Sequence, residues 1–177
     1  GTGLMKNANT TCLIGQPMNK DLEQHLGLEV RMANDANCFT LAGSRFGSVR
    51  DEEHKGLTIF GVIMGTGVGG GIVIHDRVLG GLHGIAGEWG HNPLPWPRPE
   101  ELPGPGCYCG RHGCIETFLS GPGLAADHTR ETGREDSPEA IVAAAAAGDA
   151  GAAATLSRYV DRLARGLATV VNLLDPD

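Results

Sequence analysis

The sequence has 177 residues, of which 41% are hydrophobic and 28 are glycine, a composition typical of a folded, turn-rich protein rather than a disordered one. Its formal net charge of −7 at pH 7 argues against nucleic acid and against an anionic membrane surface as partners. Apolar runs fall short of the about 20 residues that a membrane-spanning helix needs. These properties predict a cytoplasmic enzyme or small-molecule binder.

The N-terminal part of the chain indicates an α/β arrangement with a polar junction. Residues 1–20 are expected to form a loop and residues 21–28 a helix. A strand is expected at 29–33, and a second helix from Cys38 onward. Asp35 therefore lies between a strand and a helix, where α/β proteins commonly place ligand-binding groups. The alternative is that Asn34 or Asp35 only caps the helix. Cys12 and Cys38 are expected to be small buried hydrophobes.

A glycine-rich stretch follows the next predicted strand. Strands are expected at 57–64, 72–74 and 78–79, with a turn at 75–76. Gly65, Gly67 and Gly70 have the spacing of a dinucleotide-binding loop, but that motif must open a helix, and a strand-like run follows here. The sequence also lacks the Gly-Lys-Ser/Thr of a Walker A loop.

The same glycines favour a phosphate-facing hairpin. Successive glycines expose backbone N–H groups and permit positive φ, which suits the binding of phosphate oxygens. The hydroxyl of Thr66 adds a polar group at the turn. The alternative is a tight hairpin without a ligand.

One imidazole and three thiols lie at metal-ligand spacing, His-x15-Cys-x-Cys-x4-Cys, in His91, Cys107, Cys109 and Cys114. This set predicts a closed tetrahedral zinc site. Two carboxylates, Glu88 and Glu116, flank the ligands, so zinc would act as a brace for groups that hold a polyhydroxylated ligand. The alternative is reduced thiols on a loop. A disulfide framework is not indicated, because the five cysteines are odd in number and no apolar signal segment is present.

The C-terminal third is expected to be helical and to serve packing rather than chemistry. Ser137 and Pro138 form a helix start for residues 140–147. A final helix, ended by Pro176, has an apolar face made of Leu156, Val160, Leu163, Leu167, Val170, Val171 and Leu174.

Four motifs in order resemble the ROK family (repressors, open reading frames and sugar kinases). They are Asn-Asp-Ala-Asn at 34–37, Gly-Thr-Gly-Val-Gly-Gly-Gly at 65–71, Gly-Glu-Trp-Gly-His at 87–91 and Cys-Tyr-Cys-Gly-Arg-His-Gly-Cys-Ile-Glu at 107–116. The resemblance implies the α/β actin-like, hexokinase-like ATPase fold with its ribonuclease H-like motif. The sequences at 6–9 and 87–96 are most similar to the family's bacterial fructokinases, which implies phosphorylation of fructose to fructose 6-phosphate.

The resemblance implies a role for each motif. Asp35 would be the catalytic base that takes the proton of the sugar hydroxyl. The other hydroxyls would be held by Asn34, Glu88, His91 and Glu116, with Asn9 in a loop that approaches the sugar. His91 would also bind the structural zinc through its second nitrogen. The phosphates of ATP, bridged by Mg²⁺, would contact Gly65, Thr66, Gly67, Gly69 and Gly70. Phosphoryl transfer asks mainly for positioning and charge neutralisation, so one carboxylate near the nucleophile is sufficient.

The resemblance also implies a two-lobed enzyme of which this chain holds a part. Residues 1–45 would end the small lobe and carry the catalytic Asp, and 46–177 would form most of the large lobe. An N-terminal Asp-x-Gly-Gly-Thr phosphate loop and a C-terminal adenosine site are expected outside the chain, which reads as an internal fragment. We expect the fragment alone to lack kinase activity. A homodimer is one possible assembly, since many relatives are dimers.

Three other functions stay open at this point. A kinase for glucose, mannose or N-acetylglucosamine would use the same hydroxyl-binding groups. A sugar-sensing transcriptional repressor of the family would keep the zinc and the sugar site, but it has no use for a base at Asp35 or for a phosphate loop at 65–71. A plain zinc-binding interaction module would leave Glu88 and Glu116 unexplained.

Overall fold

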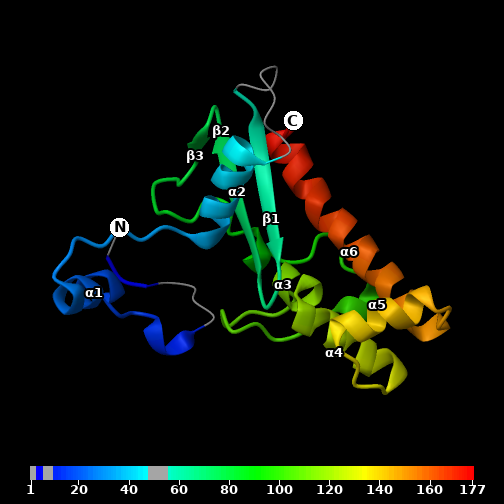
Figure 1. Cartoon of the computed structure of the whole chain (residues 1–177). Helices are drawn as coiled ribbons and strands as arrows, with labels where there is room; N and C mark the ends of the chain where they lie inside the picture. Colours follow the sequence, from blue (N-terminus) through cyan, green and yellow to red (C-terminus); the bar gives the residue numbers. More distant parts are fainter. Residues whose placement is uncertain (1–2, 6–9, 48–55) are drawn as a thin grey trace.

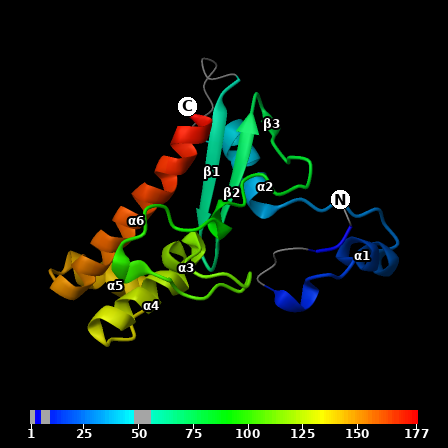
Figure 2. The same cartoon turned by 180° about the vertical axis from the view of Figure 1, so that it is seen from behind.

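The computed structural model describes residues 3–5, 10–47 and 56–177 of the chain (Figure 1). Its elements are, in order, η1 (Thr11–Leu13), α1 (Met18–Leu26), α2 (Asp35–Phe46), β1 (Thr58–Met64), β2 (Val68–Ile74), β3 (Arg77–Val78), η3 (Trp89–His91), η4 (Pro99–Glu101), α3 (Ile115–Leu119), α4 (Gly121–Thr132), α5 (Pro138–Ala146) and α6 (Ala150–Leu174). The strands form one antiparallel sheet in the order β1-β2-β3. In both views α2 lies on one side of this sheet and the long helix α6 on the other (Figures 1 and 2).

Most of the predicted elements are confirmed. Helix α1 ends as expected where Gly27 adopts the left-handed conformation, with φ of 66°. The turn at 75–76 joins β2 to β3 with both residues at positive φ. Helix α5 begins after Ser137, whose hydroxyl accepts a hydrogen bond from the backbone N–H of Ala140 at 3.2 Å.

The predicted strand at 29–33 is wrong. These residues form no ladder, and none of the described strands pairs with them. The backbone N–H of Val30 donates instead to the Glu23 carboxylate at 3.1 Å. Alternation of side chains indicates a strand only where a neighbouring strand supplies hydrogen-bond partners.

The glycines of the hairpin let helix α2 approach the sheet closely. A Cβ on Gly61 would lie 2.0 Å from the Thr40 hydroxyl, and a Cβ on Gly71 would lie 2.6 Å from the carbonyl oxygen of Ala36. Gly61 and Gly71 are cross-strand partners in β1 and β2. At these two positions the sheet has no room for side chains, and α2 covers it there through Ala36 and Thr40, both 2% exposed.

The opposite face of the hairpin is covered by the main hydrophobic core. Trp89 packs edge-on against Phe60, with ring centroids 5.6 Å apart, and its indole N–H donates to the carbonyl oxygen of Gly69 at 3.0 Å. The buried side chains of this core are Val68, Trp89, Leu94, Ile115, Phe118, Leu119 and Val170. A smaller core joins α4, α5 and α6 through Leu124, Ile141 and Ala152.

The apolar face of α6 is narrower than predicted. Leu156, Leu163, Leu167, Val170 and Leu174 pack inward, but Val160 and Val171 are 61% and 51% exposed. Among the described residues no single helix is long and apolar enough to cross a membrane; α5 and α6 pass that test only as a pair, bent by 114° at their break.

Two further expectations concern the N-terminal part. Cys12 and Cys38 are exposed, so the prediction that both are buried hydrophobes is wrong. Helix α2, which carries residue 45, packs on β1 and β2. The division of the chain into residues 1–45 and 46–177 stays a prediction.

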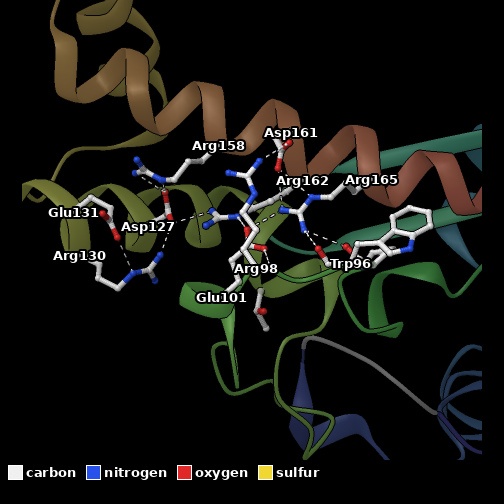
Figure 3. A network of polar contacts seen from close by, with 12 residues as sticks. Trp96, Arg98, Glu101, Asp127, Arg130, Glu131, Arg158, Asp161, Arg162 and Arg165 are labelled. Carbon is white, nitrogen blue, oxygen red and sulfur yellow. Dashed lines mark hydrogen bonds and ion pairs between the residues drawn. The ribbon is translucent and has the colours of Figure 1, made fainter.

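A buried ionic network, which the sequence patterns do not reveal, ties α6 to α4 and to the proline-rich segment before the cysteines (Figure 3). The Arg162 guanidinium, 3% exposed, donates to Glu101 at 2.8 Å and to Asp127 at 2.9 Å. Arg165 donates to the same Glu101 oxygen at 2.8 Å and to the carbonyl oxygen of Trp96 at 2.8 Å. Removing Glu101 or Arg162 would leave the remaining buried charges with fewer partners.

The network predicts an acid-sensitive contribution to stability. Burial by itself would raise the pKa of Glu101, but hydrogen bonds from Arg165 and Arg162 outweigh it and lower the pKa to about 2. Because this lies below the ordinary value near 4.5, the stabilisation is fully present above about pH 4.5 and is lost as the pH falls towards 2.

Urea unfolding between pH 6 and pH 2 tests this contribution against a Glu101→Gln variant. We expect the difference in free energy of unfolding between the two proteins to shrink by roughly 2 to 3 kcal/mol over that range. A difference that does not change with pH would show that the folded protein does not lower the pKa of Glu101.

Candidate functional site

The predicted site residues, although far apart in sequence, line one cavity of about 860 Å³. Its walls come from the N-terminal segment, the turn between β1 and β2, and the region around η3 and the cysteines. The predicted residues on it are Asn34, Asp35, Gly65, Thr66, Gly67, Gly69, Gly70, Glu88, His91 and Glu116. Asn9, predicted to approach the sugar, lies outside the described residues.

At the start of α2, Asn34 caps the helix and the next residue, Asp35, presents its carboxylate to the cavity. Asn34 is the N-cap, and its side-chain oxygen accepts from the backbone N–H of Asn37 at 3.0 Å. Asp35 is the first helical residue, and one of its oxygens accepts from the backbone N–H of Ala36 at 2.9 Å. The capping alternative thus describes Asn34, whereas the Asp35 carboxylate is exposed on the cavity wall.

Glu88 and His91 are placed by the short helix η3, which Trp89 fastens to β2. Gly87 and Gly90 allow this close approach, since a Cβ on either would lie within 2.4 Å of a β2 carbonyl oxygen. Burial raises the pKa of Glu88; His91 opposes that shift, and Asp35 and Glu116 add to it. The three carboxylates therefore influence one another across a single cavity.

Glu116 lies at the start of α3 and is 8% exposed. One of its oxygens accepts a hydrogen bond from the backbone N–H of Val68 at 2.9 Å, at the first residue of β2. The side chain thus joins the segment that follows the cysteines to the end of the glycine turn. This contact fixes one carboxylate oxygen at the cavity wall.

The glycine turn is shorter than the predicted loop, and Gly70 is required for close packing rather than for positive φ. Strand β2 already begins at Val68, so Gly69 and Gly70 belong to the ladder, and only residues 65–67 form the turn. None of these glycines has positive φ. A Cβ on Gly70 would instead lie 2.8 Å from Trp89 and from Phe60, so close packing requires the glycine. Thr66, at the tip, is exposed and lines the cavity.

His91, Cys107, Cys109 and Cys114 form one cluster whose ligand atoms all lie within 4.8 Å of one another. The Nδ1 atom of His91 is 3.6 Å from the sulfur of Cys107, and the sulfurs of Cys109 and Cys114 are 3.6 Å apart. Tetrahedral zinc with ordinary bond lengths separates its ligand atoms by about 3.6 to 3.8 Å. The donor set and the spacing therefore fit a zinc ion.

Comparison with known proteins identifies the family. The model of the ROK family matches residues 1–177. The chain belongs to the ROK family. It is 37% identical over 180 residues to the N-acetyl-D-glucosamine kinase of Aliivibrio salmonicida (strain LFI1238), an alignment that covers 99% of this chain and 58% of that kinase. This ROK chain thus spans a little over half the length of that relative.

Solved ROK structures share the fold. The glucokinase from Streptomyces griseus in complex with glucose and AMPPNP superposes with a TM-score of 0.78 at 28% identity, covering 93% of this chain and 55% of that one. A ROK transcriptional regulator, a homolog of the E. coli MLC protein, gives a TM-score of 0.71 at 31% identity, covering 92% and 41%. The predicted actin-like, hexokinase-like ATPase fold is confirmed for the part that this ROK chain covers.

Tyr108 is a polar cavity residue that sequence reasoning missed. It lies between two cysteines of the cluster, and its hydroxyl is 3.0 Å from Nε2 of His91. Burial raises its pKa to about 12, with Glu116 and Cys107 adding to the shift, so the phenol keeps its proton at neutral pH. The sequence does contain a signal for this residue, its position inside the Cys-x-Cys motif of this ROK chain. A residue between two candidate metal ligands must lie near the metal site.

The thiols of the cluster differ in their tendency to lose a proton. Burial raises the pKa of Cys114 to about 12. Burial opposes ionisation of Cys109 too, but a hydrogen bond from the backbone N–H of Arg111 contributes to an overall lowered pKa. Because a zinc ligand is a thiolate, metal binding must displace the proton of Cys114.

Proposed function

We propose that the protein containing this chain transfers a phosphoryl group from ATP to a hydroxyl of a hexose, and that N-acetylglucosamine is its preferred substrate. The observation that carries the proposal is one cavity with an exposed carboxylate at a helix start, two further carboxylates, a histidine and a hairpin turn. The preference for N-acetylglucosamine over fructose rests on the related kinases at 37% identity.

Each residue has a defined task in this proposal. Asp35 takes the proton of the attacking hydroxyl, because among the three carboxylates of the cavity it is the exposed one and lies at the start of α2. The remaining sugar hydroxyls are held by Asn34, Glu88, His91 and Glu116. The turn at 65–67, with the Thr66 hydroxyl, faces the phosphates of ATP, whose bound Mg²⁺ would neutralise charge on them.

Zinc would supply rigidity rather than chemistry. Four protein ligands would fill its tetrahedral coordination, which leaves no open position for substrate. Bound to Nδ1 of His91, the ion would fix the ring so that Nε2 faces the cavity. The two-lobed division near residue 45 and a homodimeric assembly remain part of this proposal.

Release of ADP by the complete protein tests the proposal. The assay supplies MgATP with N-acetylglucosamine, glucose, mannose or fructose in parallel. We expect the highest kcat/KM with N-acetylglucosamine, by about tenfold or more, because a site built to hydrogen-bond one substituent rejects sugars that lack it. Preference for another hexose would keep the mechanism and change the substrate. Sugar binding without any turnover would favour a sugar-sensing regulator.

A further inference from the structure

Tyr108 places a hydroxyl group in the cavity next to the carboxylates. Its ring stands edge-on to the ring of His91, with centroids 5.1 Å apart and planes at 85°, and its hydroxyl lies 3.0 Å from Nε2 of His91. The side chain is 46% exposed and lines the same cavity as Asp35, Glu88 and Glu116. The proposed mechanism assigns it no task.

The metal cluster decides the direction of the hydrogen bond between these two rings. Nδ1 of His91 belongs to the cluster, 3.6 Å from the sulfur of Cys107. A ring nitrogen that binds a metal carries no proton, so the proton of the neutral imidazole is on Nε2. With zinc on Nδ1, Nε2–H would donate to the oxygen of Tyr108, and a sugar hydroxyl held by His91 would share that donor. The O–H of Tyr108 is then free to donate to a different acceptor.

The carboxylates of the cavity lack such a donor, and besides the Asn34 amide and the Thr66 hydroxyl the Tyr108 hydroxyl supplies one. Asp35, Glu88 and Glu116 accept hydrogen bonds when they are ionised, which suits sugar hydroxyls that donate. An amide carbonyl oxygen can only accept, so none of these carboxylates can hold it. The Tyr108 hydroxyl, with its acceptor side taken by His91, meets this requirement.

We propose that Tyr108 is a specificity-determining residue, which donates a hydrogen bond to the carbonyl oxygen of a 2-acetamido group on the substrate. This inference rests on the proposed function, because it names the substituent by which that site selects its sugar. It predicts that loss of the hydroxyl lowers the preference for N-acetylglucosamine over glucose, two sugars that differ only in this substituent.

A Tyr108→Phe variant of the complete protein tests the inference, since it keeps the ring and removes only the hydroxyl. We expect kcat/KM for N-acetylglucosamine to fall about 10- to 100-fold, mainly through KM, and that for glucose to change by less than about threefold. Zinc content and thermal stability should match wild type. Tyr159→Phe is the matched control, because the Tyr159 hydroxyl donates to the carbonyl oxygen of Leu119 and does not line the cavity.

Direct binding of both sugars by calorimetry separates this inference from the proposed function. A wild-type protein that binds N-acetylglucosamine without turnover would sink the kinase proposal, and the binding data for Tyr108→Phe would still decide the role of Tyr108. Equal losses for both sugars would overturn the inference, because they would show that Tyr108 acts only by orienting His91. Unchanged affinities for both sugars would overturn it as well.

Discussion

Replacing Asp35 by Asn is expected to lower turnover by about 10²- to 10⁴-fold while sugar affinity stays within a few-fold of wild type. Asn keeps the size of the side chain and can still accept a hydrogen bond from the backbone N–H of Ala36, as Asp35 does at 2.9 Å. It cannot take a proton from the attacking hydroxyl. The helix start should not suffer, because Asn34 provides the cap.

The assay for this variant pairs ADP release with calorimetric sugar binding. Asp76→Asn is the matched control, because Asp76 is an exposed aspartate in the turn between β2 and β3 and does not line the cavity. We expect the control to keep wild-type turnover. Loss of sugar binding in Asp35→Asn, together with loss of turnover, would make Asp35 a binding or structural group instead of a base.

The residues that meet at the cavity could be predicted from sequence because each motif has its own local cause. Asp35 follows a capping Asn, Glu88 and His91 are separated by one short helical turn, and Glu116 opens the helix after Cys114. These relations depend on neighbours in the chain, so the sequence reveals them. That the segments lie on one cavity follows from long-range contacts such as that of Glu116 with Val68, which spacing alone does not reveal.

The misassigned elements have a common physical reason. Residues 29–33 alternate like a strand, yet pairing depends on a partner that local sequence does not reveal. The glycines of the hairpin suggested unusual φ values, yet Gly61 and Gly71 are required by the approach of α2 to within contact of the backbone. In both cases the local sequence pattern does not show the tertiary contacts that decide the structure.

The charged residues of α6 show the same limit. Arg162 lies on a helix whose apolar pattern predicts packing alone, but its guanidinium is buried between Glu101 and Asp127. Those two partners come from segments 61 and 35 residues away. A sequence pattern with a helical period cannot identify partners at such separations. The network holds the segment that leads into the cysteine cluster against the helical part of the molecule.

Substituting Cys109 by Ser is expected to remove zinc and to weaken sugar binding together. Ser supplies no thiolate, and the loss of one of four ligands typically abolishes tight binding of a structural metal. Cys109 is exposed, so the smaller hydroxyl creates no cavity in the core. The cysteine segment itself is also tied by backbone hydrogen bonds, Leu94 N–H to Gly113 and Ile115 N–H to Asn92, both at 2.9 Å. The fold should therefore survive the loss of the metal.

In the proposed function, zinc would set the orientation of the His91 ring, and with it the contact to Tyr108. Without the metal, His91 is free to rotate or to carry its proton on Nδ1, so Nε2 no longer presents a fixed donor. We expect metal analysis to show less than about a tenth of the wild-type zinc, and calorimetry to show sugar affinity lower by about 10- to 100-fold. Cys12→Ser, an exposed cysteine outside the cluster, is the matched control and should retain both. If the zinc-free variant binds sugar as tightly as wild type, zinc does not brace the site, and the cluster serves the fold alone.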